Sequence, residues 1–350
     1  METVFVAMSG GMDSSFAAYM LKQQGYEVVG ITFQLLPAYI KNVNNPKACC
    51  SIETVARARK VADDLSIAHY VLNLREEFER HVIEPFIREY REGRTPNPCI
   101  LCNKHIKFSA FFRKALAMGA HKVATGHYGR IAKTPAGPRL RKAADRAKDQ
   151  SYFLYPIEQG VLGQLLFPLG NETKEELKKQ AHLIGWEAGR VKESQDICFV
   201  PDNDYRQFLS PFVELKQGPA YFVDGTLLGR HDGVHLYTLG QRRGLAIPFR
   251  EPLYVVEMRC EENALILGTK EHTKKRRLSA GEVNLLGKPS GQAMGKVRYR
   301  QRDVPCTYRF SRGLLDVEFA EPIHAITPGQ SVVLYEDDMV VAGGVIKEAG

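Results

Sequence analysis

Long hydrophobic runs are absent from this 350-residue sequence. Charged residues interrupt the apolar ones throughout, so no stretch approaches the roughly 18 consecutive apolar residues of a membrane-spanning helix. Residues 1–8 also lack the basic segment with which a secretory signal peptide begins. We therefore predict a protein of the cytoplasm that has no membrane partner.

Cysteines are few, and their number is odd. The seven are not preceded by a secretory signal, which argues against a structural disulfide framework. In a reducing compartment, cysteines that the fold brings together are more often catalytic, redox-active or metal-binding. The tandem Cys49 and Cys50 cannot easily serve one centre, so surface or packing roles are expected for them. Cys260 and Cys306 stand in strand-like runs, which indicates structural roles.

The balance of charge is basic, with a formal net charge of +8 and a pI near 9.0. Such a surface attracts a polyanionic partner through an interaction that weakens steeply with salt. Many basic proteins bind nothing anionic, so charge alone does not identify the partner.

The first half of the chain alternates short apolar runs with helical periodicity, a pattern that predicts a doubly wound parallel sheet flanked by helices. Strands are expected at residues 3–8, 27–33, 69–74 and 122–125, and the first helix at residues 14–24. Open sheets of this kind bind ligands beyond the carboxyl ends of their strands. The site residues should therefore directly follow the strands.

Helical character persists through residues 174–184 and fades after about residue 200, beyond which short strand-like runs alternate with glycine and proline. We predict an α/β fold in three parts. A catalytic domain spans residues 1–202, a small, mostly β linker domain spans 203–273, and a β-barrel-like domain spans 274–350.

The first strand leads directly into the sequence SGGMDSS at residues 9–15, and a helix follows. Paired glycines let the backbone turn with its N–H groups exposed, the serines add hydroxyl donors, and a helix N-terminus favours an anion. This loop predicts a phosphate-binding site. It lacks the Gly-Lys-Ser/Thr ending of the Walker loop, so transfer of a γ-phosphoryl group is not indicated. A merely structural glycine turn is the alternative.

A second motif, TPNPCILCN, occupies residues 95–103 and places Cys99 and Cys102 at the start of a predicted helix. The helix dipole there lowers the pKa of a thiol and favours the thiolate. Half of a zinc site is the alternative, but no second CxxC pair completes it. Cys198, beside Ile197 and Phe199, by itself resembles a buried small hydrophobe.

Several motifs follow one another in an order that is similar to the bacterial tRNA-specific 2-thiouridylases (the MnmA family), members of the N-type ATP pyrophosphatase superfamily. The superfamily loop is SGGxDS, and the more specific motifs are TPNPCxxCN, TGHY, KDQSYFL, SQDICF, the run DGxxLGxHxGxxxYTLGQRRGL at residues 224–245, and VRYRQ at 297–301. The resemblance covers essentially the whole chain.

The resemblance implies ATP-dependent 2-thiolation of the wobble uridine (U34) of tRNA, by adenylation of uracil O2 and then sulfur transfer, giving 2-thiouridine, AMP and pyrophosphate. It implies Mg²⁺ as the partner of ATP; no metal ligand is firmly assigned, although Asp13 lies near the Mg²⁺-pyrophosphate in the family. The ATP-binding residues that match the family are Ala7, Met8, Ser9, Gly10, Gly11, Met12, Asp13, Ser14, Phe33 and Gly126.

For the sulfur chemistry, the resemblance implies that Cys198 carries a persulfide and that Cys102 is the nucleophile that releases its sulfur, leaving a transient Cys102–Cys198 disulfide. An upstream persulfide donor, a cysteine desulfurase or a sulfur-relay protein, would load Cys198. Asn97, Pro98 and Cys99 match the family's contacts to the target base. Some members carry a proposed aspartate base where this chain has Cys99, so that role does not transfer.

Two alternatives remain open at this point. Cys99, Cys102 and Cys198 could ligate a [4Fe-4S] cluster whose open iron delivers sulfide in the same reaction. The chain could instead be another adenylating ligase of the superfamily, which would leave the cysteines unexplained. The tRNA partner is supported by the residues that match the family's tRNA contacts, namely Lys148, Asp149, Gln150, Arg298 and Tyr299.

Overall fold

The structure, a computed structural model, describes residues 1–40, 52–184, 186, 197–201 and 204–350. Cys49 and Cys50 lie outside the described residues. The chain forms two compact units. Unit 1 comprises Met1–Ile83, Pro98–Asn203 and Asp338–Val340, and unit 2 comprises Glu84–Asn97, Asp204–Asp337 and Val341–Gly350.

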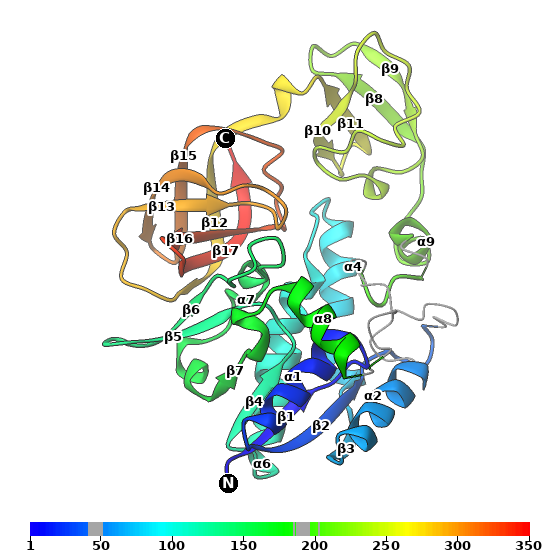
Figure 1. The fold of residues 1–350 in the computed structure, drawn as a ribbon. Coiled ribbons are helices and arrows are strands. Elements are labelled where there is room, and N and C mark those ends of the chain that lie inside the picture. Colours follow the sequence, from blue (N-terminus) through cyan, green and yellow to red (C-terminus); the bar gives the residue numbers. More distant parts are fainter. Residues whose placement is uncertain (41–51, 185, 187–196, 202–203) are drawn as a thin grey trace. The chain divides into compact units, whose positions relative to one another are not determined.

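Unit 1 is built on a five-stranded parallel sheet with the strand order β3-β2-β1-β4-β7 (Figure 1). Its strands are β1 (Thr3–Ala7), β2 (Glu27–Gln34), β3 (Ala68–Asn73), β4 (Lys122–Thr125) and β7 (Leu165–Leu166). Apolar runs such as Val4–Val6 are fully buried, because helices cover both faces of the sheet. The predicted α/β class is confirmed.

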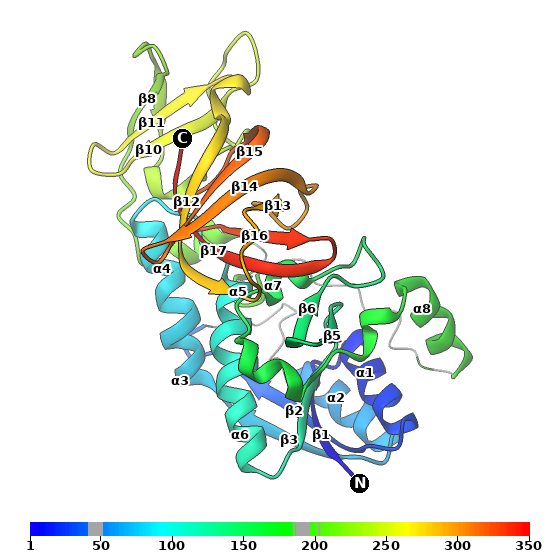
Figure 2. The ribbon, with the colours of Figure 1, turned by 90° about the vertical axis from the view of Figure 1, so that its left-hand side faces the viewer.

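The helices of unit 1 lie on the two faces of this sheet (Figure 2). The chain runs outward from β1 to β3 and then returns past β1 to β4, and right-handed connections place the helices of the two directions on opposite faces. One face carries α1 (Met12–Gln23) and α2 (Ile52–Asp64). The return connection contains α3 (Arg75–Phe78), the π-helix η1 (Glu79–Ile83), α5 (Pro98–Leu101), the π-helix η2 (Cys102–Phe111) and α6 (Phe112–Ala117).

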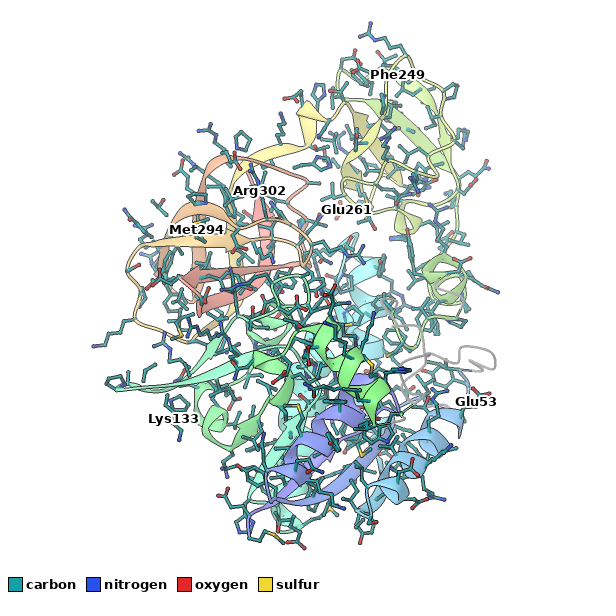
Figure 3. All side chains as sticks on the ribbon, in the orientation of Figure 1. Glu53, Lys133, Phe249, Glu261, Met294 and Arg302 are labelled. Atoms are coloured by element: carbon teal, nitrogen blue, oxygen red, sulfur yellow. The ribbon has the colours of Figure 1, made fainter. Side chains whose placement is uncertain are left out.

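Unit 1 continues after β4 with a hairpin and further helices. The hairpin joins β5 (Arg130–Thr134), which carries the Lys133 labelled in Figure 3, to β6 (Gly137–Arg141). The helices are α7 (Ser151–Leu154), η3 (Gln159–Gln164), η4 (Pro168–Asn171) and α8 (Lys174–Leu183). Beyond α8, Trp186 contacts Phe16 and Tyr19 edge-on, at 6.2 and 5.6 Å between ring centroids. The sole tryptophan is thus a packing anchor.

Unit 2 contains a small sheet of four strands in the order β10-β11-β8-β9. These are β8 (Gly218–Phe222), β9 (Leu227–His231), β10 (Tyr254–Arg259) and β11 (Ala264–Gly268), and short helices accompany them: α4 (Glu84–Arg91), α9 (Tyr205–Leu209), η7 (Val234–Leu236) and η8 (Glu271–Thr273). In Figure 3, Glu261 marks the turn between β10 and β11, and Phe249 marks the loop before β10. A mostly β linker was predicted here.

The C-terminal strands form a closed antiparallel barrel of six strands, because β12 pairs with both β15 and β17. They are β12 (Lys274–Leu285), β13 (Gln292–Lys296), β14 (Val304–Ser311), β15 (Leu314–His324), β16 (Ser331–Glu336) and β17 (Met339–Ala349). Cys306 is buried in the barrel core, and burial raises the pKa of its thiol to about 12, which makes it inert packing. The barrel confirms the predicted fold, whereas the exact boundaries of three domains stay a prediction.

No helix among the described residues is long and apolar enough to cross a membrane.

Candidate functional site

The loop between β1 and α1 is held in shape by its serines. The backbone N–H of Ser9 donates to Ser14 Oγ at 3.0 Å, and Ser14 Oγ donates to the carbonyl of Gly11 at 3.1 Å. Gly10 has φ +65°, and a Cβ there would lie 2.7 Å from the carbonyl oxygen of Thr54. Helix α1 has 12 residues and begins at Met12, two residues before the predicted start. Its N-cap residue, Gly11, has no side chain to cap the first N–H groups, so these remain available to bind an anion.

The loop after β4 lies directly against the loop after β1. A Cβ on Gly126 would lie 2.7 Å from the nitrogen of Ser14 and 2.8 Å from the carbonyl carbon of Asp13. These two loops flank the point where the strand order reverses, which is where open α/β sheets bind their ligands. The structure therefore brings Gly126 and the predicted loop of residues 7–14 together. Phe33, at the carboxyl end of β2, packs its ring 4.9 Å from that of Phe111.

The carboxylate of Asp13 accepts two hydrogen bonds at its Oδ1 atom. Tyr128 Oη donates at 2.8 Å, and Lys174 Nζ donates at 2.6 Å from a side chain that is only 7% exposed. Sequence reasoning missed Lys174. A signal was present, because this lysine is the first residue of α8, where the helix dipole disfavours a positive charge unless it has another partner. The pair ties the N-termini of α1 and α8 together.

The thiols occupy the helices of the return connection. Cys99 is exposed on α5, whereas Cys102, the first residue of η2, is 8% exposed. The predicted helix start at the CxxC motif is confirmed, since α5 begins at Pro98. Cys198 is half-buried beside Phe199, whose ring packs 5.7 Å from that of Phe78. Residues 194–196 of the SQDICF motif lie outside the described residues, whereas residues 197–199 of the motif are described.

The described residues contain no cluster with the geometry of a metal site. No group of three or more His, Cys, Asp or Glu side chains there is arranged to hold a metal ion. Cys99, Cys102 and Cys198, all among the described residues, therefore do not form such a group. His231 and His235, four residues apart, instead hydrogen-bond to the backbone carbonyls of Asn263 and Tyr90, at 3.0 Å each.

His127 is a half-buried histidine in the loop after β4. Its Nδ1 lies 2.7 Å from Thr125 Oγ1, and its Nε2 lies 3.3 Å from Lys107 Nζ. Burial, followed by the positive charge of Lys107, holds the pKa of His127 well below 6.5. A lysine ammonium can only donate, so Nε2 is the acceptor and Nδ1 carries the proton. His127 is therefore neutral, with its tautomer fixed.

The predicted tRNA-binding residues of unit 1 lie in the loop before α7. Lys148 is half-buried. Asp149 is 5% exposed, and its carboxylate accepts from the nitrogen of Ala143 at 2.9 Å and from Ser151 Oγ at 2.8 Å. Gln150 Oε1 accepts from the nitrogen of Tyr128 at 2.9 Å. The hydrogen bonds of Asp149 and Gln150 therefore stabilise this loop beside Tyr128, which also donates to Asp13. Contact of these residues with tRNA stays a prediction.

A basic cluster lies beside this loop in unit 1. Asp338 forms ion pairs with Arg130 at 3.4 Å, with Arg141 at 3.2 Å and with Arg146. One carboxylate shared by three guanidinium groups leaves the cluster with an excess of positive charge. Such an excess attracts phosphates.

In unit 2, Arg298 is held by backbone and hydroxyl oxygens. Its Nη2 donates to the carbonyl of Ala325 at 2.9 Å and to Thr327 Oγ1 at 2.8 Å, with a longer contact of 3.3 Å to the carbonyl of Leu239. These neutral acceptors orient the guanidinium without cancelling its charge. Tyr299 is half-buried. Their contact with tRNA also stays a prediction.

Three family models match the chain in succession. A tRNA methyl transferase HUP domain matches residues 2–202, a tRNA methyl transferase PRC-barrel domain matches 206–269, and an aminomethyltransferase beta-barrel domain matches 275–346.

Curated relatives align with the chain from end to end. A tRNA-specific 2-thiouridylase of Lachnoclostridium phytofermentans is 42% identical over 355 residues, covering 99% of each chain. Another, of Heliobacterium modesticaldum, is 45% identical over 99% of this chain and 92% of its own length. Among solved structures, a 4-thiouridine synthetase–RNA complex with bound ATP is 18% identical over 60% of this chain and 50% of that one, with a TM-score of 0.37, too low to support an argument.

Proposed function

This chain belongs to the family of tRNA-specific 2-thiouridylases, and from that premise we propose how its own residues exchange the O2 oxygen of a tRNA uridine for sulfur. The protein is an ATP-using tRNA-uridine 2-sulfurtransferase, which forms 2-thiouridine in tRNA. The observation that carries this conclusion is the alignment of 99% of the chain with relatives at 42 and 45% identity. The finer points, beginning with the wobble position as the target, are proposals.

Adenylation is the first step that the chemistry requires. Uracil O2 is a poor leaving group and must first be activated. It attacks the α-phosphorus of ATP, pyrophosphate departs, and the adenylated oxygen can later leave as part of AMP. The proposed ATP-binding residues are Ala7, Met8, Ser9, Gly10, Gly11, Met12, Asp13 and Ser14 of the loop, together with Phe33 and Gly126. The contact between the Gly126 backbone and Ser14 supports this assignment, because it keeps side chains away from the first N–H groups of α1 at the switch point of the sheet, a place that we call the crevice.

Mg²⁺ is the proposed partner of the ATP phosphates. Magnesium binds through one or two carboxylates plus substrate phosphates. The carboxylate of Asp13, one-third exposed and oriented by Lys174 and Tyr128, is the group of this loop that fits that requirement.

Sulfur transfer is the second step. We propose that Cys198 carries the persulfide and that the Cys102 thiolate attacks its inner sulfur. The S–S bond of the persulfide breaks, hydrosulfide is released, and a Cys102–Cys198 disulfide forms. Hydrosulfide then attacks C2, the C2–O bond breaks, and AMP leaves with the original oxygen. A thiol reductant must reopen the disulfide before the next turnover.

The position of Cys102 supports its role as the nucleophile. α5 continues without a break into η2, so Cys102 lies about one turn after the helix start at Pro98, near the positive end of the helix dipole. The [4Fe-4S] alternative fits less well, because Cys99, Cys102 and Cys198 do not form a group of metal ligands among the described residues. We therefore favour the persulfide route and derive no step through a cluster.

The tRNA contacts complete the proposal. A base in an anticodon loop must be turned out of its stack before a modifying group can reach C2. Asn97, Pro98 and Cys99 are proposed to contact that base. Lys148, Asp149, Gln150, Arg298 and Tyr299 are proposed to bind the rest of the tRNA, supported by the excess of arginine around Asp338. The persulfide donor, a cysteine desulfurase or relay protein, and a location in the cytoplasm belong to the same proposal.

The decisive experiment treats unmodified tRNA with the enzyme, Mg-ATP and a persulfide source, and then maps the product by mass spectrometry. We expect 2-thiouridine at the wobble position and one AMP for each thiolated base. Thiolation at another uridine would overturn the wobble assignment, and no thiolation with a competent donor would overturn the function. A different adenylating ligase would show ATP–pyrophosphate exchange with a small-molecule acid or amine and not with tRNA.

A further inference from the structure

Cys102 and Lys107 lie on the same face of η2 because that helix has π-helical winding. The segment Cys102–Phe111 is a π-helix of 10 residues. Its i→i+5 bonding places residues five apart over one another, whereas in an α-helix only residues three and four apart share a face. The winding therefore carries the Lys107 side chain to the side of the helix that presents Cys102. Long π-helical segments are rare and often lie at functional sites.

The ammonium group of Lys107 is held in place by His127. The ammonium lies 3.3 Å from His127 Nε2, and the imidazole is in turn oriented by Thr125 Oγ1 at 2.7 Å. The rings of Phe108 and Phe167 pack around the imidazole, with centroids at 5.8 and 6.2 Å. These contacts favour one orientation of the imidazole, so its acceptor nitrogen can support the long, flexible side chain of Lys107.

His127 also connects this lysine with the nucleotide crevice. It directly follows Gly126, whose backbone touches Asp13 and Ser14 of the phosphate loop. Two lysines therefore reach the surroundings of this crevice, and their partners differ. Lys174 is paired with the carboxylate of Asp13, which neutralises it, whereas Lys107 is hydrogen-bonded to an imidazole that carries no charge. The imidazole therefore does not offset the charge of the Lys107 ammonium.

We propose that Lys107 binds the α-phosphate, first of ATP and then of the departing AMP, and that His127 is the positioning residue that aims it. The inference rests on the proposed function. When sulfur displaces AMP from C2, negative charge accumulates on the leaving phosphate, and a fixed cation stabilises that charge. Lys107 meets both requirements, since it is held beside the crevice and stands on the face of the helix that carries the sulfur-releasing thiol.

Ligand binding tests this inference without relying on activity. We would measure the Kd of adenosine, AMP and α,β-methylene-ATP by calorimetry for the wild type, Lys107→Met and Lys107→Arg. Lys107→Met should weaken AMP and the ATP analogue by about tenfold or more while adenosine binding is unchanged, as expected for the loss of a charged contact. Lys107→Arg should recover most of the loss. The adenosine measurement reports whether a variant still folds around the nucleoside.

His127 variants test the positioning role. His127→Gln retains an acceptor for the ammonium and should bind AMP better than His127→Phe, which removes the acceptor but keeps the volume. Lys114→Met is the matched control, because Lys114 stands further along the same helical segment with an exposed side chain and pairs with Glu77 at 2.8 Å. It should bind all three ligands as the wild type does.

Two outcomes would overturn the inference. One is equal loss of adenosine and AMP binding in Lys107→Met, which would make Lys107 structural. The other is unchanged AMP binding together with slower alkylation of Cys102 by iodoacetamide, which would assign the cation to the thiolate instead. Failure of the proposed function looks different, because the wild type would then form no 2-thiouridine with a competent persulfide donor, whatever its affinity for AMP.

Discussion

Gly126 and Ser14 approach each other so closely that a Cβ on Gly126 would lie 2.7 Å from the Ser14 nitrogen. The contact joins the loops that follow β1 and β4, the two strands between which the direction of winding reverses. Any side chain at residue 126 would have to push the phosphate loop aside or enter the crevice. The glycine is therefore required by the space available and not by backbone strain.

Gly126→Ala should lose nucleotide affinity. The added methyl group must displace backbone atoms of residues 13 and 14, which carry the N–H groups proposed to face the phosphates. We expect the Kd for ATP, measured by calorimetry, to rise by about tenfold or more, the equivalent of 1.4 kcal/mol or more. Binding of tRNA, measured by filter retention, should change little.

The control is Gly160→Ala, since nothing lies within 4 Å of a Cβ at that glycine and its backbone needs no positive φ. It should bind ATP as the wild type does. Unchanged ATP affinity in Gly126→Ala would mean that the nucleotide does not use this crevice.

Lys174→Met should uncouple α8 from the phosphate loop. The change removes a buried ammonium and leaves the Asp13 carboxylate with the hydrogen bond from the Tyr128 hydroxyl. We expect the free energy of unfolding, from urea titration, to fall by about 1 kcal/mol, because the Asp13 carboxylate left behind is one-third exposed and keeps part of its hydration. ATP affinity should fall as well, because Asp13 then repels the phosphates.

A double-mutant cycle with Asp13→Asn isolates the pair. In the Asp13→Asn background, Lys174→Met should cost less stability than it does in the wild type, by about 1 kcal/mol. Strict additivity of the two substitutions would show that the 2.6 Å ion pair contributes nothing to folding.

Cys198→Ser should abolish thiolation while ATP binding stays close to that of the wild type. A serine cannot carry a persulfide, but it preserves the size of a side chain that lies half-buried next to the packed ring of Phe199. The readouts are 2-thiouridine by mass spectrometry and ATP affinity by calorimetry. Cys306→Ala, in the barrel core, is the control and should retain thiolation at some cost in stability. Loss of ATP binding in Cys198→Ser would instead make Cys198 structural.

Much of the fold and part of the site could be predicted, because the decisive signals were local. A strand, two glycines and a helix start specify the phosphate loop, and proline before CxxC specifies the start of α5. Periodicity correctly located β1 to β4. The connection between Lys107 and Cys102 could not be predicted, because apolar spacing at Phe108, Phe111 and Phe112 suggests an α-helix and gives no sign of π-helical winding.

Pairs of side chains that are far apart in the sequence could not be predicted either. Asp13 and Lys174 are 161 residues apart, and Arg146 and Asp338 are 192 apart. Side chains can meet across such distances only through the topology of the sheet and loops, which short sequence windows do not contain. Asp149 illustrates the same point, since its match to the family suggested a tRNA contact, while the fold gives its carboxylate two backbone donors and a serine hydroxyl.

His127 should make the stability of the protein sensitive to mild acid. Burial lowers its folded-state pKa well below 6.5, so below about pH 6.5 the unfolded chain takes up a proton that the folded protein does not. The stabilisation is therefore fully present above pH 6.5 and is lost as the pH falls toward the folded-state pKa. One such group lowers the free energy of unfolding by up to about 1.4 kcal/mol per pH unit.

The measurement compares urea unfolding of the wild type and His127→Gln at pH 7.5 and pH 5.5. The stability difference between them should shift against the wild type at the lower pH, because glutamine does not titrate. His182→Gln, on the exposed part of α8, is the control, and its difference from the wild type should not move with pH by a comparable amount. If the His127→Gln difference were the same at both pH values, the imidazole would take up its proton as readily in the folded protein as in the unfolded chain, and the neutral support assigned to Lys107 would be lost with it.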